Sequence, residues 1–170
     1  MTGVDFENGL VDGFFLDDKN VSYNTQKNTQ NFSLCTYFFQ IIVAEDNGAV
    51  EHVRLTFNEE NSSEKSSFFY LDRVRSMLEH DDLISSIVKT SDNSKIITAS
   101  FDKSIVVSET DSFKLLSKTS DAHTDIIHSI AIPDTKSTNV LTSAGNDGIV
   151  SIWDLRALKD SNASQTCKLK

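Results

Sequence analysis

The sequence lacks the features that would place it in several large classes of protein. Its 170 residues contain no run of about 18 apolar residues, so we expect no membrane span. Residues 1–7 have neither the basic stretch nor the apolar core of a secretory signal, so secretion is not expected. Signatures of phosphate-binding loops, dinucleotide folds, zinc peptidases and serine hydrolases are also absent. We therefore expect no enzyme, no cofactor and no metal.

Cysteine and basic residues are also scarce. Cys35 and Cys167 are far apart and in no metal-binding spacing, which is typical of reduced thiols in a cytoplasmic or nuclear protein. The chain has 25 acidic and 16 basic residues, a formal net charge of −9. Such a surface repels the phosphate backbone, so we expect no nucleic acid. The acidity either serves solubility or favours basic protein partners. We expect the protein in the cytoplasm and nucleus, with basic proteins among its partners.

The sequence does contain one strand with a specific ending. An Asn-Asp-Gly turn at 146–148 leads into the alternating strand 149–152, which ends in Trp153-Asp154. His123 lies 30 residues before the tryptophan. This layout is that of a WD repeat, in which a four-stranded antiparallel sheet forms one blade of a β-propeller. Propellers mostly bind other macromolecules, so the motif favours binding over catalysis.

The second half of the chain repeats at the spacing of WD units. Residues 79–88 align with 122–131 at an offset of 43, and residues 98–105 align with 143–150 at an offset of 45. WD repeats recur about every 40–45 residues. Two independent alignments at nearly the same offset predict two consecutive blades.

A third copy of the pattern is weaker. Residues 42–53 have the same order of strand, acidic Gly turn and strand, with Val53 where the tryptophan would stand. The polar stretch 58–67 is almost free of apolar residues and predicts a loop between outer strands.

These patterns predict an all-β chain of WD40 β-propeller blades in an incomplete ring. The expected units are an N-terminal arm or remnant blade at 1–30, a degenerate blade at 31–78, blades at 79–120 and 121–165, and a tail at 166–170. We expect four-stranded blades with strands of roughly 4–7 residues. Because an open arc leaves edge strands unpaired, closing the ring would require further blades or a second chain.

Recurring polar residues predict a buried hydrogen-bond network in each of the two clear blades. In the last blade it would run from the Trp153 indole through the Ser143 hydroxyl to His123, and from there to Asp147. Buried polar groups need such partners, and a complete network fixes the register of a blade. The predicted network residues are His80, Thr98, Asp102, His123, Ser143, Asp147 and Trp153.

The earlier blade should have a shorter network, because Ser108 stands in the place of the tryptophan. An alternative assigns His123, Ser143 and Asp147 to a small hydrolase, with serine as the nucleophile. The recurrence of His and Asp at blade spacing favours the structural interpretation. His52 and His128 lie in strand patterns, and we expect neither to be a ligand.

The strings at 43–51 and 79–86 resemble the early blades of the methylosome protein 50 family, and the likeness spans 38–160. These WD-repeat subunits accompany the symmetric-dimethylating protein arginine methyltransferase. The resemblance implies a non-catalytic adaptor that docks on the methyltransferase and helps present Arg-rich substrates such as histones and Sm proteins.

The chain departs from that family in three respects. The family ring has seven blades, whereas this chain has material for about three. Residues 17–30 have no counterpart of the loop through which the family binds the enzyme, and residues 103–109 lack the Trp-Asp ending that the family has there. Another WD40 scaffold, such as a substrate receptor or an assembly factor, is the alternative.

Overall fold

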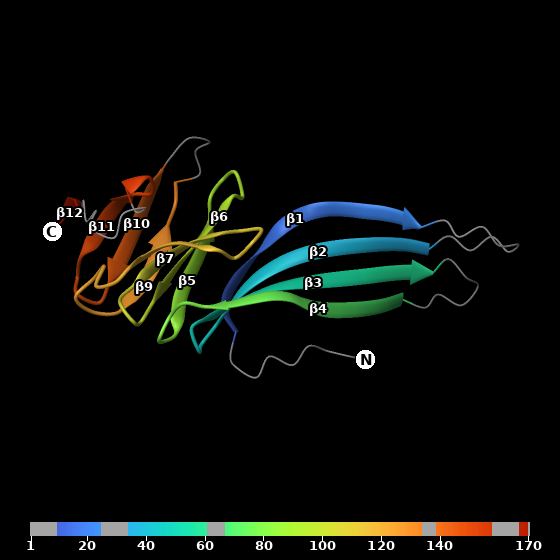
Figure 1. Cartoon of the computed structure of the whole chain (residues 1–170), viewed down its shortest axis with the longest axis horizontal. Helices are drawn as coiled ribbons and strands as arrows, with labels where there is room; N and C mark the ends of the chain where they lie inside the picture. Colours follow the sequence, from blue (N-terminus) through green and yellow to red (C-terminus); the bar gives the residue numbers. More distant parts are fainter. Residues whose placement is uncertain (1–9, 25–33, 61–66, 134–138, 158–166, 170) are drawn as a thin grey trace, which may run out of the picture.

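The computed structural model describes residues 10–24, 34–60, 67–133, 139–157 and 167–169. In these residues the chain forms three four-stranded antiparallel sheets, arranged one after another along an arc (Figure 1). The described residues form no closed ring, which confirms the expected all-β fold of blade-like sheets in an incomplete ring. No helix in this part of the chain is long and apolar enough to cross a membrane.

The first sheet is larger than expected. Its strands are β1 (Leu10–Asn24), β2 (Leu34–Glu45), β3 (Ala49–Glu60) and β4 (Ser67–Leu78), in that order across the sheet. The segment 1–30, expected as an arm or a remnant blade, supplies β1 to this sheet. β1 pairs with β2 from Leu10 opposite Glu45 to Asn24 opposite Leu34. The pairing satisfies backbone groups that β2 would otherwise expose at the edge of the sheet.

All four strands of this sheet are longer than the expected 4–7 residues: β1 has 15, and β2, β3 and β4 have 12 each. The polar stretch 58–67 was expected to be a loop, yet β3 continues to Glu60 and β4 starts at Ser67. Asn58 pairs with Phe68 in the ladder between them. Only residues 61–66 of the expected loop lie outside the described residues. The far half of the sheet extends away from the other two sheets (Figure 1).

The second and third sheets have the short strands of the expected blades. The second contains β5 (Ile84–Lys89), β6 (Lys95–Ser100), β7 (Ile105–Glu109) and β8 (Leu115–Thr119). The third contains β9 (Ile127–Ala131), β10 (Val140–Gly145), β11 (Val150–Asp154) and β12 (Cys167–Leu169). The expected tail 166–170 therefore contributes β12, which pairs with β11.

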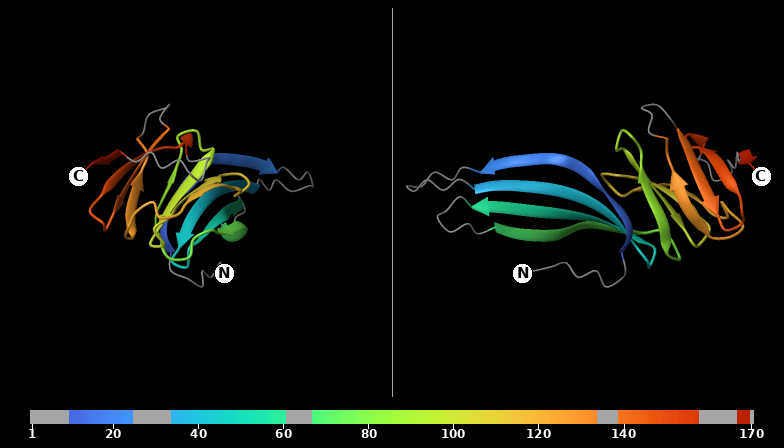
Figure 2. Two further views of the ribbon diagram at one scale, coloured as in Figure 1. Left: turned by 60° about the vertical axis from the view of Figure 1, so that its left-hand side comes forward. Right: turned by 180° about the vertical axis from the view of Figure 1, so that it is seen from behind.

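Two apolar cores join the three sheets, because alternate side chains of a strand point to opposite faces. The core between the first and second sheets contains Ile42, Ala44, Val50, Met77, Ile84, Ile87, Ile96 and Phe113. The core between the second and third contains Ile97, Ala99, Ile105, Val107, Ile127, Ile130, Leu141, Trp153 and Leu155. The first strand of each sheet contacts that of the next, so β5 lies between β1 and β9. Figure 2 shows the stacked sheets from two other sides.

Candidate functional site

The predicted network of the third sheet is assembled in full. The indole Nε1–H of Trp153 donates to Ser143 Oγ at 2.8 Å, and Ser143 Oγ lies 2.7 Å from His123 Nε2. Because this oxygen accepts the indole proton, its own proton can be donated to Nε2. His123 Nδ1–H then donates to the Asp147 carboxylate, with the nearer oxygen at 3.0 Å. The Trp153, Ser143 and His123 side chains are buried.

Backbone groups hold Asp147 in place at the end of this network. Its carboxylate accepts the N–H groups of Thr124 and Ile149, each at 3.0 Å. Burial raises the pKa of Asp147, but the hydrogen bonds from His123 and from these two amides outweigh it and hold the pKa at about 2. Gly145 leaves room for the contact, since a Cβ there would lie 2.7 Å from His123 Nδ1.

The second sheet has the equivalent network, centred on His80. Its Nε2 lies 2.8 Å from Thr98 Oγ1, and its Nδ1 lies 3.1 Å from Asp102 Oδ2. Burial lowers the pKa of His80, so the ring is held neutral. Sequence reasoning missed Ser104, whose Oγ lies 2.9 Å from His80 Nδ1 and donates to Asp102 Oδ1 at 2.7 Å. The Asp-x-Ser spacing of the turn was the available signal for it.

The second network ends at Thr98, where the third continues to a tryptophan. Ser108 stands in that place and is fully buried. Its hydroxyl has no hydrogen-bond partner among the residues that the structure describes. Asp102 still behaves like Asp147: burial raises its pKa, while hydrogen bonds from Ser104 and Asp81 outweigh burial and hold the pKa at about 2.

This geometry suits a structural role better than hydrolysis. A serine nucleophile must reach a substrate carbonyl, yet Ser143 is 1% exposed and its hydroxyl is engaged by both Trp153 and His123. His128 is exposed, and its ring stands edge-on to Phe101 with the centroids 6.1 Å apart. His52 is buried. In the described part of the chain, no group of three or more acidic, His or Cys residues could hold a metal ion.

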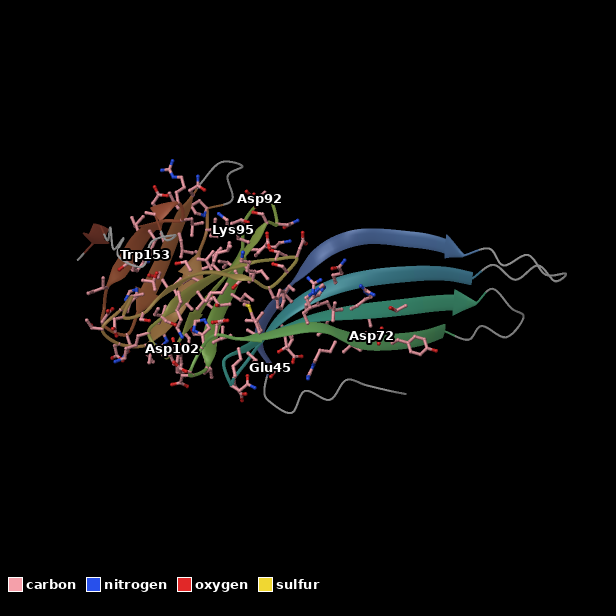
Figure 3. All side chains as sticks on the ribbon, viewed as in Figure 1. Glu45, Asp72, Asp92, Lys95, Asp102 and Trp153 are labelled. Atoms are coloured by element: carbon pink, nitrogen blue, oxygen red, sulfur yellow. The ribbon has the colours of Figure 1, made fainter. Side chains whose placement is uncertain are left out.

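The loops that carry the two networks lie along one edge of the molecule. The turn at Gly48 packs closely on the backbone of His80 and Asp82. Further along, the Ala122 amide donates to the Lys103 carbonyl oxygen, and the Asn146 amide donates to the Ile126 carbonyl oxygen. Both N···O distances are 2.9 Å. Figure 3 shows Glu45 and Asp102 on this edge and Asp92 and Lys95 on the opposite edge.

This loop edge is acidic across all three sheets. Exposed or partly exposed carboxylates line it, and we call them the acidic edge: Asp46, Asp81, Asp82, Asp121 and Asp125. Two lysines lie among these carboxylates. Lys118 is already engaged, because its Nζ donates to the Glu79 carbonyl and lies 3.8 Å from Asp81 Oδ2. Lys103 is partly exposed and offsets part of the charge near Asp125. The acidic edge therefore presents negative charge from loops of three successive sheets, which favours a basic partner.

Comparison with known families agrees with this geometry. Residues 71–107 and 114–154 match the WD40 family, described as WD domain, G-beta repeat. The two matches extend from within β4 to the end of β11 and include all seven predicted network residues. No curated protein matches the chain, so the resemblance to methylosome subunits stays a prediction.

Proposed function

We infer, from the premise that this chain is a WD-repeat protein, that it is a non-catalytic adaptor that brings protein partners together. WD40 domains generally bind proteins and are generally non-catalytic. Their specificity resides in loops and surfaces, since the buried networks serve the blades themselves. The observation that carries the proposal is the acidic edge, to which all three sheets contribute loops.

We propose further that the adaptor is of the methylosome type. Its partner would be a symmetric-dimethylating protein arginine methyltransferase, and its substrates basic proteins such as histones and Sm proteins. The resemblance at 43–51 and 79–86 and the net charge of −9 support this proposal. Such a role places the protein in the cytoplasm and the nucleus.

The proposal is tested by binding measurements with the full chain immobilised. The probes are a recombinant symmetric-dimethylating arginine methyltransferase and an Arg-rich Sm peptide. We expect both to bind, and the peptide to bind more weakly at higher salt. The double variant Asp81→Asn/Asp121→Asn should weaken peptide binding roughly three- to tenfold, because two charges leave the acidic edge.

The matched control is Asp72→Asn/Asp111→Asn, which removes the same charge from exposed residues outside the acidic edge. We expect it to bind the peptide like the wild type. Equal weakening by both double variants would mean that only net charge matters and that the edge is no binding surface. Failure of the methyltransferase to bind would favour the alternative, another WD40 scaffold such as a substrate receptor or assembly factor.

A further inference from the structure

The third sheet repeats, on its outer side, a surface that the second sheet buries. In the second sheet, Ile97, Ala99, Ile105 and Val107 pack in the core against the third sheet. The residues 45 positions later are Thr142, Ala144, Val150 and Ile152. They alternate with Leu141, Ser143 and Trp153, which point toward the second sheet, and so they lie on the opposite face. Val150 is 42% exposed there. We call these four residues the outer face of the third sheet.

The first sheet, at the other end of the arc, has the equivalent of the surface that the third sheet turns toward the second. Gly48 and Gly148 occupy the same turn position 100 residues apart, with φ of 86° and 70°. The same offset places Ile41, Val43 and Val53 at the positions of Leu141, Ser143 and Trp153. Ile42, Ala44 and Val50 point into the core with the second sheet.

Alternation along β2 therefore turns Ile41 and Val43 away from the second sheet. Val53 pairs with Ile41 in the ladder and shares its face. Ile41 and Val43 are partly exposed, whereas Val53 is buried. These three residues form the outer face of the first sheet.

By repeat position, the two outer faces are therefore equivalent to the two surfaces that meet between the second and third sheets. We propose that a second copy of this chain docks head to tail, with the outer face of the third sheet of one copy on the outer face of the first sheet of the other. Two such junctions, related by a two-fold axis, close a ring of six sheets. Propellers with about four to eight blades are common, and a two-fold axis is the usual symmetry of a homodimer.

The charge on the outer face of the first sheet is partly compensated. Glu51 pairs opposite Val43, so it lies on this face, and its carboxylate is 2.7 Å from Arg73 Nε, so covering this pair would bury no isolated charge. Alternation along β2 places Glu45 on the same face near Glu51, and its side chain is already buried in the single chain. Closure would also cover the exposed apolar side chain of Val150. The inference rests on the repeat geometry and is independent of the proposed partner.

Sedimentation equilibrium of the full chain over a range of concentrations tests the proposal. The expected species are a monomer and a dimer. Val150→Lys and Val43→Lys should each weaken the dimer by roughly 100-fold, because each change places an ammonium group in both junctions. Leu115→Lys is the matched control: Leu115 on β8 is 38% exposed and belongs to neither outer face, so dimerisation should be unchanged.

Circular dichroism must show that each variant is folded, and Ile41→Lys replaces Val43→Lys if the latter unfolds. Three results would overturn the proposal. A monomer at every concentration would mean that something other than a second copy covers these faces. A dimer weakened by Val150→Lys but not by the first-sheet variant would mean that two third sheets meet. A series of larger species would mean that the junction propagates without closing.

Discussion

Two buried serines show how the same side chain can stabilise one blade and destabilise another. Ser143 joins Trp153 to His123 and satisfies both. Ser108, in the place of the tryptophan, is equally buried, and its hydroxyl has no partner among the described residues. An unpaired buried hydroxyl costs free energy, whereas a paired one contributes a net gain. The third sheet therefore has the more complete network.

Trp153→Ala should lower the free energy of unfolding by about 3–5 kcal/mol, because it empties a buried site in the core between the second and third sheets. The exposed fraction of Trp153 is 3%. Urea titration measures the change, with Leu116→Ala on β8 as an exposed control of small expected effect. A loss below about 1 kcal/mol would mean that the blade is not packed as described.

Ser108→Ala should leave the free energy of unfolding unchanged or raise it by up to about 1 kcal/mol, since it removes a buried hydroxyl that lacks a partner. The same urea titration measures this small shift. A clear loss of stability would show that the Ser108 hydroxyl is bonded in solution, and would remove the contrast with the third sheet.

The network residues could be predicted because their chemistry repeats at fixed offsets. His80 and His123, with Asp102 and Asp147, recur at blade spacing, and one tryptophan marks the end of the full network. Ser104 was missed because its equivalent in the third sheet is Ile149, so the repeat gave no second example.

At the scale of the element, the turns between the second and third strands of each sheet were predictable and the strand lengths of the first sheet were not. Gly48 and Gly148 both have positive φ, and Lys103 takes the equivalent position with φ of 70°. An Asp-Gly or Asn-Gly pair predicts such a turn. By contrast, the polar end of β3 carries no apolar alternation, and its pairing with β4 depends on partners distant in sequence.

Gly48→Ala should destabilise the chain more than Gly148→Ala. Both substitutions strain the backbone, by about 1–2 kcal/mol each, because φ is positive. At Gly48 the new Cβ would also lie 2.6 Å from the carbonyl oxygen of His80, whereas at Gly148 it meets nothing within 4 Å. Thermal melting compares the two variants. If they melted together, the Gly48 turn would not pack on the second sheet.

At the scale of the whole molecule, acid should destabilise the fold in two stages. The pKa of His80 is lowered from 6.5, so the unfolded chain binds that proton first and stability falls as the pH drops below about 6.5. The pKa of both Asp102 and Asp147 is about 2 instead of 3.8, so the stability they contribute is lost between about pH 4 and 2.

Urea titrations between pH 8 and 2 measure this dependence, and Asp147→Asn should reduce its lower stage to the contribution of Asp102. Stability that rose toward acid over this range would contradict the assignment of these buried groups.

The all-β arc of blades could be predicted from the repeat, because each blade carries its own strand and turn signals. The membership of β1 in the first sheet could not, since residues 10–24 carry no recognisable copy of the WD pattern. They join the sheet through backbone pairing with β2, which depends little on side-chain identity.

The central claim is that the His–Ser–Asp set of the third sheet holds a scaffold together and performs no chemistry. Denaturant unfolding of Ser143→Ala, paired with an ester hydrolysis assay, tests it most directly. The variant should lose about 1–3 kcal/mol of unfolding free energy, because the Trp153 indole and the His123 ring both lose their partner. Hydrolysis should stay at background in both proteins. Unchanged stability, together with a wild-type hydrolase activity that the variant lacks, would contradict the claim.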